Sequence, residues 1–150
     1  MPGPTVLAYD GSPAADAAIR AAATSLAESA AVVVTAWVSV LFAGPLGFGN
    51  PHVDPDVDAA QAARAASICE HGADVAREAG FAAVSARAEH ADGAAWATIL
   101  AVADEVDASV IVVGARGLST VSSALLGSVS HAVAQHARRP VLIVPPATPR

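Results

Sequence analysis

Two patterns of apolar and polar residues alternate along this chain: short continuous apolar runs, and longer stretches whose apolar residues recur three and four positions apart. Continuous runs are typical of strands buried on both faces, and the second spacing is typical of helices with one buried face. We expect strands at residues 5–9, 31–38, 81–89, 109–113 and 140–144, and helices at residues 13–28, at residues 56–79, after a cap at Asp92, and at residues 128–138. This alternation predicts an α/β fold, an open parallel sheet with helices on both faces.

Local signals support several of these boundaries. Ser12 followed by Pro13 is a typical helix start, because the hydroxyl caps the first turn and proline tolerates the first helical position. In the helix after Asp92, four apolar residues fall on one face at helical spacing: Trp96, Ile99, Leu100 and Ala103. The run at residues 81–89 is more polar than the others, so we expect it near a sheet edge.

Length and charge limit the possible functions. The 150 residues are enough for one domain, expected to span residues 1–150 with an ordered core at about residues 4–145. Hydrophobic residues make up 54% of the chain and the formal net charge is −6, which argues against nucleic acid as a partner. All eight basic residues are arginines. The absence of lysine excludes Schiff-base chemistry and the phosphate-binding lysine of Walker-type loops.

The compartment follows from the cysteine content and from one uncharged segment. Cys69 is the only cysteine, so no internal disulfide forms and a reducing compartment, the cytoplasm, is expected. Residues 30–50 carry no charge, but they begin as a β-branched strand and continue as a glycine- and proline-containing loop, which argues against a membrane span. The loop at residues 39–55 is longer than most connections, which makes it a candidate functional segment.

The candidate chemistry lies after the strand at residues 109–113. There the chain reads Gly114-Ala-Arg-Gly117, then nine residues, then Gly127-Ser128. Glycines permit positive φ and a close approach of backbone to ligand, and the start of the following helix offers Ser128, Ser130 and free N–H groups to an anion. The alternative is that these glycines are ordinary turn and cap residues.

Arg116 lies inside this glycine motif. Its charge either offsets that of a bound phosphate or faces solvent, and the sequence leaves both readings open.

The whole pattern resembles the ATP-binding signature of the universal stress protein family, with every spacing met. Tyr9-Asp10-Gly11-Ser12 resembles the end of that family's first strand, and residues 140–145 resemble its closing segment. The resemblance covers nearly the whole chain. It implies a Rossmann-like, five-stranded sheet in the order 3-2-1-4-5, a homodimer and a role in stress physiology.

The resemblance also implies the site residues. Those at the nucleoside are Ala8, Tyr9 and Asp10, with Val38 at adenine; those along the ribose and phosphates are Val113, Gly114 and Gly117; those at the phosphates are Gly127, Ser128, Val129 and Ser130.

Three functions remain open. The first is an ATP-binding regulatory module, in which Asp10 hydrogen-bonds the nucleoside or helps to hold Mg²⁺. The second is a slow ATPase or phosphotransferase in the same pocket, although the sequence shows no evident general base beside the phosphate motif. The third is a dimeric partner-binding protein that does not use ATP. In the implied strand order residues 141–144 form an apolar sheet edge, and we expect two copies to pair antiparallel there.

Overall fold

The computed structural model describes residues 2–39, 55–117 and 126–146 of the chain, and strands and helices alternate through them. The strands are β1 (Thr5–Ala8), β2 (Ala30–Trp37), β3 (Ala83–His90), β4 (Val110–Gly114) and β5 (Val141–Val144). The helices are α1 (Pro13–Leu26), α2 (Pro55–Ala79), α3 (Ala95–Glu105) and α4 (Ser128–His136). All neighbouring strands pair in parallel, in the order β3-β2-β1-β4-β5. The expected fold class is therefore confirmed.

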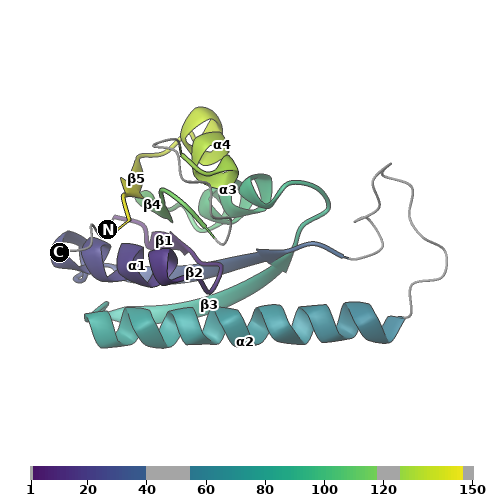
Figure 1. The fold of residues 1–150 in the computed structure, drawn as a ribbon. Coiled ribbons are helices and arrows are strands. Elements are labelled where there is room, and N and C mark those ends of the chain that lie inside the picture. Colours follow the sequence, from purple (N-terminus) through teal and green to yellow (C-terminus); the bar gives the residue numbers. More distant parts are fainter. Residues whose placement is uncertain (1, 40–54, 118–125, 147–150) are drawn as a thin grey trace.

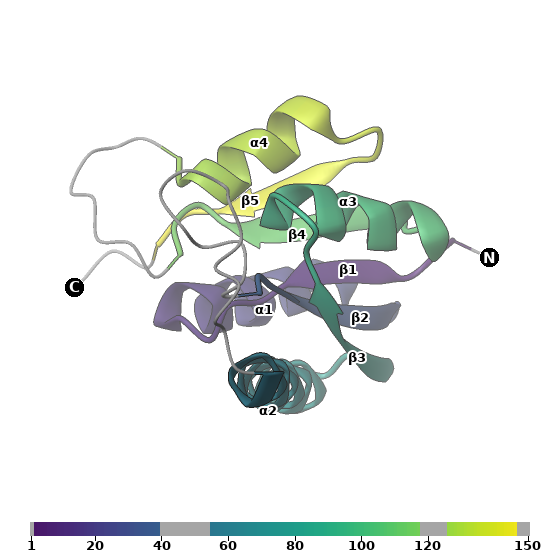
Figure 2. The same cartoon turned by 90° about the vertical axis from the view of Figure 1, so that its right-hand side faces the viewer.

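Two layers of helices cover the two faces of the sheet. Figure 1 shows α1 and α2 on one face and α3 and α4 on the other, and Figure 2 shows the same layers after a quarter turn. Alternate strand residues feed the two cores: Leu7 and Val33 pack towards α1 and α2, whereas Val6 and Val34 pack towards α3 and α4. Each of these four side chains is at most 1% exposed, as expected for strands covered on both sides.

Most local predictions are confirmed to within a few residues. The Ser12 hydroxyl caps α1 by accepting a hydrogen bond from the Ala15 N–H at 3.1 Å. Ile99 and Ala103 are buried in the α3/α4 core, with Trp96 and Leu100 packed against it. β3 forms one edge of the sheet. Among the described residues no helix combines the length and apolarity that crossing a membrane requires.

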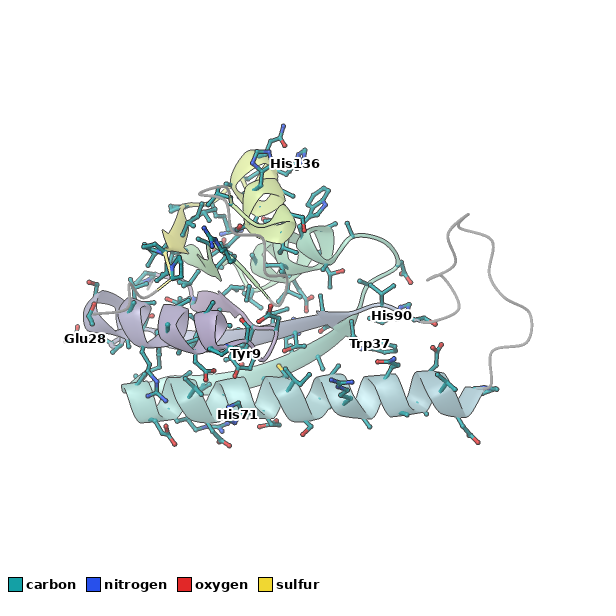
Figure 3. All side chains as sticks on the ribbon, in the orientation of Figure 1. Tyr9, Glu28, Trp37, His71, His90 and His136 are labelled. Atoms are coloured by element: carbon teal, nitrogen blue, oxygen red, sulfur yellow. The ribbon has the colours of Figure 1, made fainter. Side chains whose placement is uncertain are left out.

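The predicted cap at Asp92 is wrong. Helix α3 begins at Ala95, its N-cap is Ala94, and no side chain bonds to the cap position. Strand β3 runs to His90, one residue further than expected, so that Asp92 lies in the turn before the helix, too early to cap it. Its carboxylate instead lies 3.0 Å from His90 Nδ1. The His90 ring in turn meets the Trp37 ring edge-on at 4.8 Å, and both are labelled in Figure 3.

Candidate functional site

A cavity of about 310 Å³ opens at the carboxyl ends of β1, β2 and β4, on the face covered by α3 and α4. In open parallel sheets this edge is where ligands bind. The lining combines strand ends, the start of α1, the start of α3, the glycine motif and the start of α4: Ala8, Tyr9, Asp10, Ala15, Val34, Ala36, Ala95, Ile99, Val113, Gly114, Arg116, Gly117, Gly127, Ser128, Val129 and Ser130. Segments more than a hundred residues apart in sequence thus line the same cavity.

The lining contains every candidate residue from the sequence except Val38. Val38 follows the last residue of β2 and is 44% exposed. Its neighbours on the same side of the strand, Val34 and Ala36, line the cavity in its place. The candidate loop lies largely outside the described residues.

Sequence reasoning missed five lining residues: Ala15, Val34, Ala36, Ala95 and Ile99. The signal for two of them was present in the strand pattern. Val34 and Ala36 are separated from Val38 by two and four positions, so they share its face of the strand. The residues of α1 and α3 carried no such signal, because apolar residues in a helix are most often ordinary core residues.

The Asp10 carboxylate joins the two halves of the site. Its Oδ1 accepts a hydrogen bond from the Ser12 N–H at 2.9 Å, in the turn between β1 and α1. Its Oδ2 lies against Gly117, where an added Cβ would stand 2.5 Å away. The positive φ expected in the motif is not found at Gly117, since within the described residues only Gly11 and Gly80 among the glycines have positive φ. Gly117 is needed for close approach to Asp10 and not for backbone conformation.

The first turn of α4 supplies hydrogen-bond donors. Its first intrahelical bond runs from the His131 N–H to the Gly127 C=O at 2.9 Å. The N–H groups of Ser128, Val129 and Ser130 precede it and have no acceptor within the helix. These donors and the positive end of the helix dipole suit an anion.

Ser130 contributes to this turn mainly as a structural residue. Its side chain is 3% exposed, and its hydroxyl lies 2.9 Å from the Ala115 C=O and 3.0 Å from the Gly127 C=O. Because the hydroxyl donates to these carbonyls, it ties the glycine motif to α4. Ser128, which is exposed, is the better placed hydroxyl for a ligand.

Tyr9 reaches the cavity with its backbone, while its side chain packs on the opposite face of the sheet (Figure 3). The phenol donates a hydrogen bond to Asp16 Oδ1 at 2.5 Å. Burial, reinforced by this bond and by the negative charge of Asp16, raises the pKa of Tyr9 well above its ordinary value. The phenol therefore stays protonated and remains a donor.

Few ionisable side chains line the cavity in the described part of the chain. Among the described residues the lining includes one carboxylate, Asp10, one guanidinium, Arg116, and no histidine. No three acidic, histidine or cysteine side chains in the described part of the chain lie close enough to hold a metal ion. A Mg²⁺ ion at Asp10 would take its other ligands from phosphate oxygens and water, which is its usual coordination in nucleotide sites.

Comparison with known proteins identifies relatives along the whole chain. The model of the universal stress protein family matches residues 1–145. Universal stress protein YxiE of Bacillus subtilis is 44% identical over 77 residues, 51% of this chain and 50% of that protein. The matched segment thus spans about half the length of this curated relative.

Solved structures extend the similarity. A universal stress protein in complex with cAMP is 28% identical, with a TM-score of 0.69 over 98% of this chain and 100% of that one. The universal stress protein of Archaeoglobus fulgidus in complex with dAMP is 26% identical, with a TM-score of 0.65 over 94% and 96% of the two chains. UspA of Lactobacillus plantarum, 21% identical over 96% and 99% of the two chains, has a TM-score of 0.69 and shares the fold.

Proposed function

Because the chain belongs to the universal stress protein family, we propose that it binds an adenine nucleotide, ATP in the first instance, and acts as a nucleotide-dependent regulatory module of the stress response. The observation that carries the proposal is the cavity, in which Asp10 of the β1–α1 turn meets the glycine motif that follows β4. Two structural neighbours, complexes with cAMP and dAMP, support an adenine nucleotide as the ligand.

The proposed binding mode assigns the apolar end of the cavity to the base and the α4 end to phosphate. Ala8, Asp10 and the Tyr9 backbone face the nucleoside, and Val38 stays an expected adenine contact outside the present lining. Val113, Gly114 and Gly117 border the ribose and phosphates. Gly127, Ser128, Val129 and Ser130 supply the phosphate donors, mainly through the N–H groups of the first turn of α4.

Charge bears on the number of phosphates. The chain carries a net charge of −6 and has no lysine, and Arg116 is the one cation among the described residues of the lining. To balance its negative charge, a triphosphate therefore needs Arg116, the α4 dipole and Mg²⁺ together. A monophosphate carries less negative charge and needs fewer of these groups. The neighbouring complexes hold monophosphates.

Calorimetric titration of the nucleotide-free protein tests the proposal. ATP, AMP, cAMP and GTP are compared with and without Mg²⁺. We expect the adenine nucleotides to bind and GTP to bind at least about tenfold more weakly, a difference of about 1.4 kcal/mol. Absence of binding by every adenine nucleotide would reject the proposed ligand. Equal binding of GTP would reject the proposed base selectivity.

A regulatory module fits the cavity better than the alternative of an ATPase or phosphotransferase. The Asp10 carboxylate already accepts the Ser12 N–H, and the described lining offers no second acidic residue to activate a nucleophile. We expect bound ATP to exchange faster than it is hydrolysed. Hydrolysis faster than exchange, followed with labelled ATP, would favour the enzyme.

The cytoplasm is the proposed compartment. The single cysteine, Cys69, is a buried free thiol, which is compatible with a reducing environment.

A homodimer through β5 is the proposed assembly. β5 is an edge of the sheet, no strand among the described residues pairs with its outer side, and Leu142 is 38% exposed. Pairing of β5 with its copy would satisfy the unpaired backbone groups and cover that side chain.

Leu142→Asp tests this interface. Ile143 is partly buried against the α3/α4 core, so a charge there would destabilise the fold, whereas Leu142 is exposed. We expect the wild type to sediment as a dimer at micromolar concentration and Leu142→Asp to shift towards monomer. A monomeric wild type, or an equally dimeric variant, would reject this interface.

A further inference from the structure

Three hydrogen bonds hold Tyr9, the residue immediately before the proposed ligand contact Asp10. Its N–H donates to the Val34 C=O at 2.9 Å, and its C=O accepts from the Thr35 hydroxyl at 2.9 Å. Its phenol donates to Asp16 Oδ1 at 2.5 Å. Thr35 is 5% exposed and Tyr9 is 4% exposed. The Thr35 bond is therefore buried, and the phenol bond to Asp16 is partly buried. The backbone immediately before Asp10 therefore has little freedom.

The phenol bond closes a loop around the turn that presents Asp10. Residues 10–15 lie between its two partners and include Gly11, whose φ is +80°, and the Ser12 cap of α1. The loop has inner bonds as well, because Ser12 donates to Asp10 through its N–H and accepts from the Asp16 N–H through its C=O. A change in the phenol bond is thus transmitted to Asp10 through a short, hydrogen-bonded segment.

Helix α2 seals the ring from the other side. An added Cβ at Gly72 would stand 2.5 Å from Tyr9 Cδ1 and 2.7 Å from its Cγ, so the ring rests directly on the helix backbone. The His71 ring lies 6.2 Å from the Tyr9 ring, centre to centre. The ring has no room to swing away from Asp16 without moving α2.

We propose that Tyr9 is a positioning residue for Asp10: its bond to Asp16, on the face away from the cavity, holds the β1–α1 turn so that the Asp10 carboxylate stands against Gly117 in the cavity. This inference rests on the proposed nucleotide site. It assigns to a buried residue of the α1/α2 core a role in affinity for a ligand on the opposite face of the sheet.

Tyr9→Phe in the full-length protein tests the inference, because it removes the hydroxyl and keeps the ring. Calorimetry is performed with ATP and cAMP. We expect the Kd to rise by about tenfold, or about 1.4 kcal/mol. In an Asp10→Ala background the same substitution is expected to change the Kd by less than about twofold, whereas in a Ser128→Ala background it keeps its full effect.

Thr5→Val is the matched control. It removes another partly buried side-chain hydrogen bond, between Thr5 Oγ1 and Ser29 Oγ at 2.8 Å, at the start of β1, whereas Tyr9 follows the end of that strand. We expect it to lower the melting temperature and to leave the Kd unchanged. An unchanged Kd in Tyr9→Phe, or an equal loss in the Asp10→Ala background, would overturn the positioning role.

A measurement without nucleotide separates this inference from the proposed function. The amide proton of Ser12 bonds to Asp10 Oδ1, so its NMR chemical shift reports the position of the carboxylate. We expect an upfield shift of the Ser12 amide in Tyr9→Phe and none in Thr5→Val. If the wild type binds no nucleotide, the proposed function fails. An unmoved Ser12 amide in Tyr9→Phe overturns the positioning of Asp10 in either case.

Discussion

Small residues, glycine and alanine, lie on both faces of the sheet, but they have different effects on packing there. On the α1/α2 face, Gly72, Ala73 and Ala76 of α2 are buried, and the helix comes close enough for the Tyr9 ring to rest on its backbone. On the α3/α4 face, Ala36 and Ala95 border a cavity of about 310 Å³. Small side chains allow close packing in the first region and leave room for a ligand in the second.

This contrast shows that an alanine-rich composition does not determine packing by itself. What differs between the faces is where the helices lie relative to the strand ends. α2 runs along β2 and β3 and closes its face, whereas α3 and α4 flank the carboxyl ends of β1 and β4 and leave that edge open. Substitutions that add volume should therefore affect stability on one face and affinity on the other.

The largest expected effect is that of Gly117→Val on the cavity face. The new Cβ would stand 2.5 Å from Asp10 Oδ2 and displace that carboxylate, while the branched side chain would enter the ligand space. We expect nucleotide affinity to fall by about a hundredfold or more, or about 2.7 kcal/mol, with little change in melting temperature, because only the flexible end of a side chain must move.

Gly93→Val is the control for that substitution. Gly93 lies in the turn before α3, and nothing stands within 4 Å of an added Cβ. We expect wild-type affinity. Wild-type affinity in a folded Gly117→Val protein, checked by calorimetry and circular dichroism, would show that the glycine motif is not part of the nucleotide site.

Asp10→Ala should weaken the nucleotide by about tenfold to a hundredfold, since it removes a hydrogen bond from a charged group worth roughly 1.5–3 kcal/mol. Asp10→Asn is the companion variant, because it retains an acceptor for the Ser12 N–H and lacks the charge. If Asp10 serves only the turn, the melting temperature of Asp10→Ala will fall and the Kd from calorimetry will stay at the wild-type value.

A pair of alanine substitutions compares the faces directly. Ala76 is 0% exposed in the α1/α2 core, so Ala76→Leu should lower the free energy of unfolding by about 1–3 kcal/mol and leave the Kd unchanged. Ala95 lines the cavity, so Ala95→Leu should raise the Kd by about tenfold and alter stability by less than about 0.5 kcal/mol. Denaturant titration and calorimetry on both variants measure the four quantities. The same response in both variants would contradict the distinction between the faces.

The smallest expected effect is a change in stability at alkaline pH. It concerns Tyr9, the single tyrosine of the chain. Its pKa is raised in the folded protein by burial and by Asp16. Its contribution to stability is therefore complete below the ordinary tyrosine pKa of about 10 and is lost as the pH rises above it. Tyrosinate absorbance should appear at higher pH in the folded than in the unfolded protein, and the loss of stability above about pH 10 should be smaller in Tyr9→Phe. Ordinary titration in the folded state would contradict a closed α1/α2 face.

The fold was predictable from the sequence because its signals are local. The continuous apolar runs of β2 and β4 and the Ser12-Pro13 start of α1 each place an element without knowledge of the rest. The strand order depended on the family resemblance, since local pattern does not say which strands are neighbours. The cap at Asp92 was misplaced because the exact end of β3 depends on pairing with β2 up to His90, which is a tertiary property.

The candidate site was predictable where it is made of motifs and not where it is made of packing. Gly117 and Gly127 belong to a motif whose spacing is visible in the sequence, and both line the cavity. Ala95 and Ile99 carry none, because their role depends on where α3 lies over the sheet. The same holds for Tyr9, whose side chain turns away from the cavity because successive strand residues face opposite sides.

Backbone amide NMR during titration with ATP and Mg²⁺ tests the central claim most directly. A nucleotide in the proposed cavity should shift the amides of Gly114, Gly117 and residues 128–130 most, and should leave those of residues 69–76 of α2 in place. Absence of shifts, or largest shifts on α2, would contradict a nucleotide site on the α3/α4 face.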